Sequence, residues 1–168
     1  MFYNIDSISP VCAQLHAEGK SIILATGFFD LLHSEHINFL QKAKAKGDIL
    51  IVAVESDERA RALKGEGRPV ETQLLRCQHL LGILLPTGSD PQNKLVDYVL
   101  ALPPDFDHFE AYDSLMFSIK PDIYAVSAHT SHQNSKEFLA QKYGGHLEVV
   151  HDWNPDISTT KLISQNHV

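Results

Sequence analysis

Cysteine is scarce in this 168-residue chain, and so are other features that would assign a class of protein. The only two cysteines, Cys12 and Cys77, lack the spacing of a metal site and indicate free thiols in a reducing compartment. Basic residues number 14 against 21 acidic ones, and the net charge of -7 argues against a general nucleic-acid surface, although a small basic pocket stays possible. The first residues lack a signal-peptide pattern, and the longest apolar stretch, residues 74–85, is too short and too polar to span a bilayer. We therefore expect a soluble, cytoplasmic protein.

The chain has no internal repeat and no low-complexity tract, and its length and 43% hydrophobic content fit a single domain over residues 1–168. Strand-like and helix-like segments alternate along it. We expect strands at 21–25, 49–54, 96–102, 123–126 and 146–150, and helices at 10–18, 34–46, 55–63, 72–85, 109–119, 135–143 and from 158 onward. This alternation predicts an α/β fold with a five-stranded, mostly parallel sheet and helices on both faces. Ligands of such folds bind beyond the carboxyl ends of the strands, so functional motifs should follow strands.

The segment from Gly27 to His36 follows the first predicted strand and leads into a predicted helix. Gly27 allows the backbone to approach a ligand closely, and Asp30 could cap the turn or orient a partner. His33 and His36 stand at the start of the helix, where imidazole and free backbone N–H groups suit a phosphate. The alternative interpretation is an ordinary strand-to-helix loop in which the histidines are incidental.

Two further groups of residues would suit an anion. Lys64 and Arg68 lie in a glycine-containing loop, and Arg76 in the following helix could reach the same cleft, although a solvated charged loop would give the same pattern. Ser158, Thr159 and Thr160 offer hydroxyl groups at a helix start, where simple N-capping is the alternative.

Histidines also follow the last two predicted strands. His129 and His132 come after the fourth strand and His151 after the fifth, so the predicted fold would bring them to the cleft of His33 and His36. They could bind anionic groups of a substrate, form part of a metal site, or be surface loop residues. The sequence leaves these readings open, and the metal, if any, is unknown.

The segment Gly27-Phe28-Phe29-Asp30-Leu31-Leu32-His33-Ser34-Glu35-His36 resembles the G-x-F-D-x-x-H-x-G-H signature of the nucleotidyltransferase superfamily. The similarity continues over nearly the whole chain, through Leu63-Lys64-Gly65 with Arg68-Pro69, Lys120-Pro121-Asp122 and Ile157-Ser158-Thr159-Thr160. The chain looks like the cytidylyltransferases that activate glycerol-3-phosphate or phosphocholine and the adenylyltransferases that activate heptose 1-phosphate. The loop at 63–69 leans toward the heptose type.

The resemblance implies a single Rossmann-like domain that joins a nucleoside monophosphate from CTP or ATP to a small sugar or polyol phosphate and releases pyrophosphate. Such transfer depends on in-line positioning and on cationic stabilisation of developing charge, usually with Mg²⁺. The resemblance implies catalytic roles for His33, His36 and Lys64, and it is compatible with a homodimer that binds neither nucleic acid nor membrane. The expected contacts to nucleotide or substrate are Gly27, Phe28, Phe29, Asp30, Glu35, Arg68, Arg76, His129, His132, Ser158, Thr159 and Thr160.

Glu35 departs from the signature, because the family has glycine at this position. A carboxylate about 4 Å from a phosphate charge costs roughly 4 kcal/mol at an effective dielectric constant of about 20, if it points inward. It could instead point outward, or meet Mg²⁺ or a basic residue such as Lys64. Residues 127–130 and 153–156 also differ from the family pattern. The rival hypothesis is therefore a catalytically weakened nucleotide- or anion-binding protein of the same fold, and a metal-dependent variant built on the extra histidines is a third.

Overall fold

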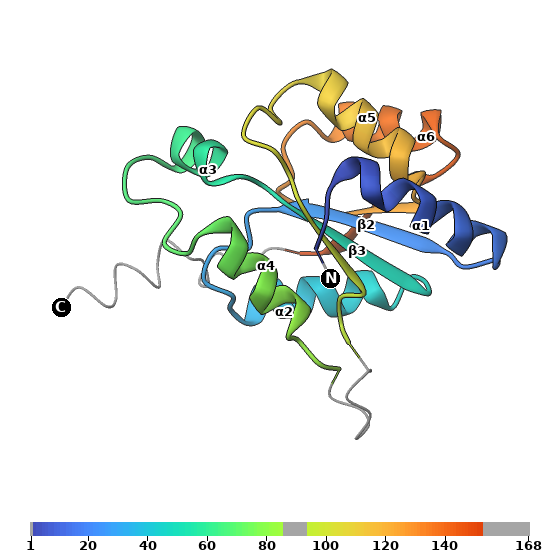
Figure 1. Ribbon diagram of the computed structural model, residues 1–168, viewed down its shortest axis with the longest axis horizontal. Coiled ribbons are helices and arrows are strands. Elements are labelled where there is room, and N and C mark those ends of the chain that lie inside the picture. Colours follow the sequence, from blue (N-terminus) through green and yellow to red (C-terminus); the bar gives the residue numbers. More distant parts are fainter. Residues whose placement is uncertain (1, 86–93, 153–168) are drawn as a thin grey trace.

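The molecule is built around one parallel sheet, seen in a computed structural model that describes residues 2–85 and 94–152 (Figure 1). Six strands in the described residues pair in the order β1-β4-β3-β2-β5-β6, and every pairing is parallel. Their bounds are Phe2–Tyr3 (β1), Ile22–Gly27 (β2), Ile49–Val54 (β3), Tyr98–Ala101 (β4), Ile123–Ser127 (β5) and His146–His151 (β6). The predicted α/β fold with a mostly parallel sheet is confirmed. The five predicted strands are β2 to β6, and the two-residue β1 is an addition at one edge.

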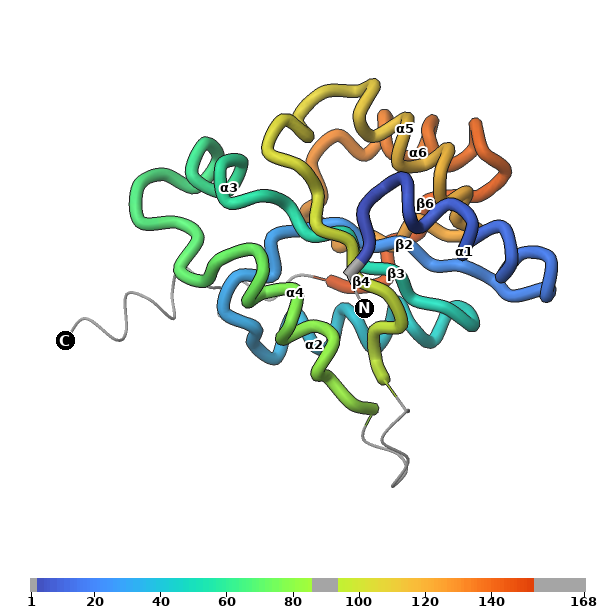
Figure 2. The backbone as a smooth tube through the Cα atoms, viewed as in Figure 1, coloured from blue at the N-terminus to red at the C-terminus, as the bar shows by residue number. Residues whose placement is uncertain are grey.

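Helices cover both faces of the sheet (Figures 1 and 2). One face carries Ile5–Ala17 (α1), Phe109–Ile119 (α5) and Gln133–Lys142 (α6), and the other carries Ser34–Lys44 (α2) and Gln73–Leu81 (α4). Asp57–Lys64 (α3) lies beyond the end of β3, at the left of Figure 1. The connections from strand to helix therefore gather at the carboxyl ends of the strands.

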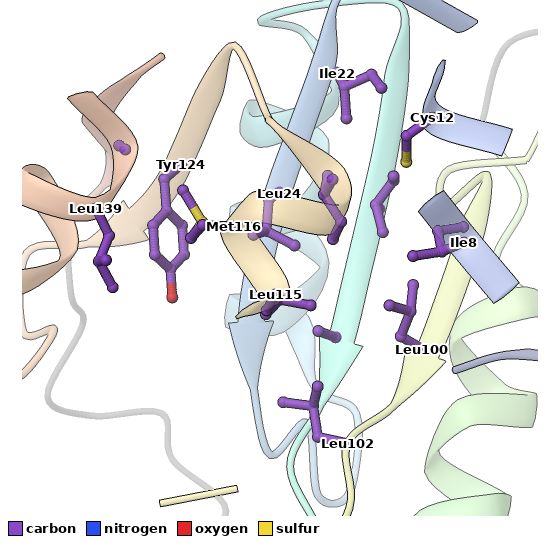
Figure 3. Packing of buried hydrophobic residues seen from close by; sticks show 14 of the residues in the cluster. Ile8, Cys12, Ile22, Leu24, Leu100, Leu102, Leu115, Met116, Tyr124 and Leu139 are labelled. Carbon is purple, nitrogen blue, oxygen red and sulfur yellow. The ribbon is translucent and has the colours of Figure 1, made fainter. Parts of the chain in front are cut away.

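Each central strand is buried on both faces, which explains why its sequence is a continuous apolar run. Alternate residues of β2 belong to different cores: Ile22 and Leu24 pack toward α1 and α5, whereas Ile23 and Ala25 pack toward α2 and α4. Figure 3 shows the first of these clusters, in which Leu115 and Met116 of α5 lie against the strands. The two cysteines are buried, free thiols, and burial raises the pKa of each to about 11.

Helix α1 begins five residues before the predicted start and contains Pro10, the residue that the sequence pattern placed at its beginning. Asn4 caps the helix by accepting from the backbone N–H of Ser7, whose hydroxyl bonds back to Asn4. Ile8 is fully buried in the core. This reciprocal cap and the packing of the first turns stabilise the helix across the proline.

No helix formed by the described residues is long and apolar enough to cross a membrane. The cytoplasmic location and the homodimer expected from the sequence stay predictions.

Candidate functional site

A cavity of about 360 Å³, which we call the first cavity, opens where the carboxyl ends of β2 and β5 diverge. These strands lie side by side, but the chain leaves them toward opposite edges of the sheet, which makes this the switch point where such folds bind ligands. Its walls bring together distant segments: residues 26–30, His33, Glu35, His36 and Phe39, Lys64, Arg68, residues 126, 127, 129 and 130, and His151. The location expected for the motifs is therefore the location of a cavity.

His33 and His36 stack on each other at the start of α2, with ring centroids 3.8 Å apart, and Phe29 lies against His36 at 5.5 Å. Burial lowers the pKa of His36 to about 3, and it also lowers the pKa of His33. Both rings are therefore neutral at pH 7, and each can donate one N–H. The Nδ1 atoms of both rings are buried without a hydrogen-bond partner in the described part of the chain, so the pair has capacity to bond a ligand.

Asp30 holds the loop that carries Arg68. Its buried carboxylate accepts from Arg68 Nε at 3.0 Å and from the backbone N–H groups of Val70 and Glu71. The sequence-based expectation that Asp30 orients a partner fits this arrangement. Arg68 is thus placed at the cavity wall by a carboxylate in the signature segment, and not by the loop alone.

Glu35 lines the first cavity, so its carboxylate does not simply face solvent. Its Oε2 accepts from His151 Nε2 at 2.9 Å, and His151 Nδ1 lies 3.1 Å from Lys42 Nζ. Because an ammonium group can only donate, Nδ1 is the acceptor and Nε2 carries the proton. His151 is therefore a basic partner of Glu35, and Lys42 adds positive charge on the other side of that imidazole.

Arg76 does not reach the cavity, which corrects the expectation that it contacts a ligand. Its side chain is fully buried, and it donates to the backbone carbonyls of Phe28, Glu55 and Glu71 and to the carboxylate of Asp57 at 2.6 Å. An arginine in the first turns of a helix looks the same in sequence whether it points to solvent, a ligand or the interior. Here Arg76 positions the backbone of three segments: the loop after β2, the residues after β3 and the residues before α4.

The other three histidines expected at the cleft do not all line the same cavity. His129 and His151 line the first cavity, whereas His132 begins the approach to α6 and lines a neighbouring cavity, which corrects its expected place beside His129. In residues 2–85 and 94–152, no group of three or more His, Cys, Asp or Glu side chains is placed to hold a metal ion. The expected contacts Ser158, Thr159 and Thr160 lie outside the described residues.

Several residues of this region belong to no motif. Lys42 follows Glu35 by seven residues, two helical turns, and this spacing on one helix face was the available signal. Glu55 and Arg59 are spaced as a helical ion pair directly after β3, and their atoms lie 3.2 Å apart.

The first cavity as a whole suits a polyphosphate, because it combines cationic Lys64 and Arg68 with neutral imidazoles and the amides of a helix start.

Comparison with known proteins agrees with this geometry. A family model described as cytidylyltransferase-like matches residues 24–165. The bifunctional protein HldE of Alcanivorax borkumensis is 34% identical over 155 residues, which cover 89% of this chain and 28% of that protein. HldE of a Nitratiruptor species is 38% identical over 162 residues, covering 96% of this chain and 31% of that protein. The chain thus spans less than a third of the length of these relatives.

Two solved structures share the fold. The lipopolysaccharide core biosynthesis protein of Thermoplasma volcanium has a TM-score of 0.59 and 25% identity, covering 79% of this chain and 96% of that chain. Pantoate-beta-alanine ligase of Francisella tularensis has a TM-score of 0.53, covering 99% of this chain and 76% of that chain. At 12% identity, the second likeness concerns the fold alone.

Proposed function

Since the chain belongs to the cytidylyltransferase-like family, we propose that it is a nucleotidyltransferase acting on a small phosphorylated acceptor, with CTP or ATP as donor. An oxygen of the acceptor phosphate attacks the α-phosphorus of the nucleotide. The bond between the α-phosphorus and the bridging oxygen breaks, and pyrophosphate leaves with the electron pair. The protein needs only to align the two phosphates and stabilise the charge that develops.

The observation that carries this proposal is the convergence of His33, His36, Lys64 and Arg68 on one cavity at the carboxyl edge of the sheet. We assign the two imidazoles to the triphosphate around the reacting phosphorus, since each has a buried nitrogen without a partner in the described residues. Lys64, whose Nζ lies 5.9 Å from the centroid of the Phe28 ring, supplies positive charge at the entrance. Removing one such donor typically lowers kcat about 10²- to 10³-fold.

Mg²⁺ fits this site as a companion of the nucleotide. Asp30 is engaged with Arg68 and Glu35 with His151, and the described residues form no three-ligand group of their own. Phosphate oxygens would therefore provide most of the ligands, as is usual for Mg²⁺. Such an ion would neutralise phosphate charge, and the residues of the cavity would orient the nucleotide.

The position of Glu35 favours the rival hypothesis, in which the protein binds a nucleotide or another anion but does not catalyse its transfer. Its carboxylate lines the cavity where phosphates would lie, which would weaken triphosphate binding if its charge were uncompensated. The contacts from Lys42 through His151 reduce that repulsion. We therefore place catalysis first and the binding function second.

The test is pyrophosphate release with CTP or ATP, Mg²⁺ and a panel of sugar and polyol phosphates, together with nucleotide binding by calorimetry. We expect binding and turnover with one donor. No binding and no turnover across the panel would refute the proposal.

Glu35→Gly separates the two functions, and Glu110→Gly is its control, because Glu110 is likewise the second residue of a helix but is exposed. If Glu35→Gly creates nucleotide binding that the unmodified protein lacks, the rival function is supported. An unchanged or modestly tighter nucleotide affinity supports catalysis.

A further inference from the structure

A second cavity of about 360 Å³ adjoins the first and shares Thr26, Gly27 and Phe28 with it. No motif of the sequence pointed to it. Its other walls come from α3 with Glu55 before it, from the first turns of α5, and from α6 with the residues before it. The two cavities therefore meet at the loop that follows β2.

Lys136, in the first turn of α6, places its ammonium group at the border between the two cavities. Its side chain lines the second cavity, and its Nζ donates to the hydroxyl of Thr130, which lines the first. The Nζ also lies 5.8 Å from the centroid of the buried Tyr124 ring. The hydroxyl of Tyr124 is 2.8 Å from Oγ1 of Thr26, which lines both cavities. The ring and the threonine thus hold the cation beside the place where the cavities meet.

The protein itself makes little use of this half-buried cation. An ammonium group can donate three hydrogen bonds, yet in residues 2–85 and 94–152 Lys136 Nζ donates one, to a neutral hydroxyl, and forms no ion pair. Burial lowers the pKa of Lys136, and the Glu55 charge opposes this shift. The Glu55 carboxylate is itself engaged by Tyr112 at 2.7 Å and by Arg59 at 3.2 Å. Because buried charges are normally paired, this geometry indicates that a ligand supplies the anion.

Lys142 of the same helix shows how a lysine looks when it serves the structure alone. It is exposed, its Nζ lies 2.7 Å from a carboxylate oxygen of Asp113 in α5, and it lines neither cavity. No such ion pair to a described residue accounts for the position of Lys136.

We propose that Lys136 is a further catalytic residue, whose ammonium group bonds nonbridging oxygens of the transferred phosphoryl group from the side of the second cavity. The inference rests on the proposed function, because it assigns a role in the same transfer. Lys136 keeps its protons while the acceptor oxygen bonds the α-phosphorus and pyrophosphate leaves with the electron pair. It neutralises charge on the oxygens that stay on the phosphorus. Lys64 and Arg68 line the first cavity only, whereas Lys136 lines the second and bonds a residue of the first.

Three variants test this role. Lys136→Met removes the charge and keeps an apolar side chain, and Lys142→Met is the matched control on the same helix. Thr130→Val removes the hydroxyl that accepts from Lys136 and leaves the ammonium group in place. The measurements are kcat and KM of pyrophosphate release with the donor and acceptor that react fastest in the panel above, and calorimetric nucleotide affinity. Thermal melts verify that each variant is folded.

We expect Lys136→Met to lower kcat about 10²- to 10³-fold, as for the loss of one preorganised donor to the transition state. Nucleotide affinity should stay within about threefold, because the contact strengthens as charge develops. Lys142→Met should leave kcat unchanged. Thr130→Val should lower kcat by less than about tenfold, since it removes only a hydrogen bond to a neutral group.

A rescue experiment tests whether the charge itself matters. Alkylation of Lys136→Cys with 2-bromoethylamine restores an ammonium group on a chain of equal length, with sulfur replacing one methylene. Cys12 and Cys77 are buried, and burial raises the pKa of each to about 11, so they react slowly. We expect alkylation to raise kcat of this variant at least about tenfold and to leave the unmodified protein unchanged. Because sulfur lowers the pKa of the new amine, kcat should decline at a lower alkaline pH than in the unmodified protein.

Equal kcat in Lys136→Met and Lys142→Met, an equal loss in Thr130→Val, or alkylation of Lys136→Cys without recovery would each overturn the inference. If Lys136→Met does not fold, Lys136→Cys before and after alkylation gives the same comparison. Turnover by the unmodified protein separates these results from failure of the proposed function. With turnover present, a negative result removes only the role of Lys136, whereas absence of nucleotide binding and turnover refutes both.

Discussion

The two cavities beside the loop after β2 differ in how they are made. The first is lined by neutral, stacked imidazoles and by two cations, Lys64 at the end of α3 and Arg68 in the loop that follows, all within or near recognisable motifs. The second is lined by a buried ion pair, between Glu55 after β3 and Arg59 of α3, and by Lys136 of α6. The difference teaches that the first cavity is formed mainly by residues of local sequence motifs, whereas the second arises from the packing of elements that lie far apart in the sequence.

The largest expected effect is on the free energy of unfolding, and it comes from replacing Arg76, whose side chain bonds the backbone beside both cavities. Arg76→Met leaves the carboxylate of Asp57 and the carbonyls of Phe28 and Glu55 without their buried partner. We expect the free energy of unfolding to fall by about 3–5 kcal/mol in urea titrations. Arg61→Met, which removes an exposed guanidinium, should change it by less than about 0.5 kcal/mol. Equal stability of the two variants would contradict the positioning role of Arg76.

His33→Ala should disable the first cavity alone. Loss of one donor to the triphosphate predicts a decrease in kcat of about 10²- to 10³-fold, with acceptor affinity little changed. His146→Ala is the control, since His146 is exposed at the opposite end of the sheet. Steady-state pyrophosphate release gives kcat. A variant with full kcat would remove His33 from the chemistry.

The pH dependence of stability tests whether the imidazoles of the first cavity are neutral. The pKa of His36 is lowered to about 3 in the folded protein, from 6.5. Between these values the unfolded chain binds a proton that the folded protein does not, so this residue makes stability fall as pH falls below 6.5. The contribution is about 1.4 kcal/mol per pH unit, or about 2 kcal/mol at pH 5.

The measurement is the unfolding free energy between pH 7 and pH 5 without ligand, for the unmodified protein and His36→Gln. The substitution should flatten the pH dependence by that amount. Parallel curves for the two proteins would contradict a buried, neutral His36.

The smallest effect concerns the charge compensation of Glu35. His151→Asn removes the imidazole that bonds Glu35 and Lys42, and we expect nucleotide affinity to fall about tenfold, the lower range for a charge-assisted hydrogen bond. In the Glu35→Gly background the same change should have little effect, because no carboxylate remains. A double-mutant cycle of calorimetric affinities measures the coupling. Equal losses in both backgrounds would show that His151 acts independently of Glu35.

The sequence predicted the sheet well, because β2, β3 and β5 are continuous apolar runs and their carboxyl ends must share one edge. The start of α1 was mispredicted, since a proline at position 10 normally marks a helix start and only the cap at Asn4 and tertiary packing stabilise the longer helix. For the site, the cavity containing His33, His36, Lys64 and Arg68 was predictable from motifs. The sequence did not predict the burial of Arg76, the bond between Glu35 and His151, or the second cavity. These features depend on contacts between residues 20 to more than 100 positions apart.

Arg76 touches neither proposed ligand, yet it binds the backbone of Phe28, which both cavities share, and of Glu55, which belongs to the second. One guanidinium therefore fixes the spacing between the loop that both cavities share and the backbone of Glu55. A misalignment of about 1 Å between reacting groups can cost a hundredfold in rate. With this spacing fixed by a side chain that lines neither cavity, a substitution in the lining of the second cavity need not move the loop that both cavities share.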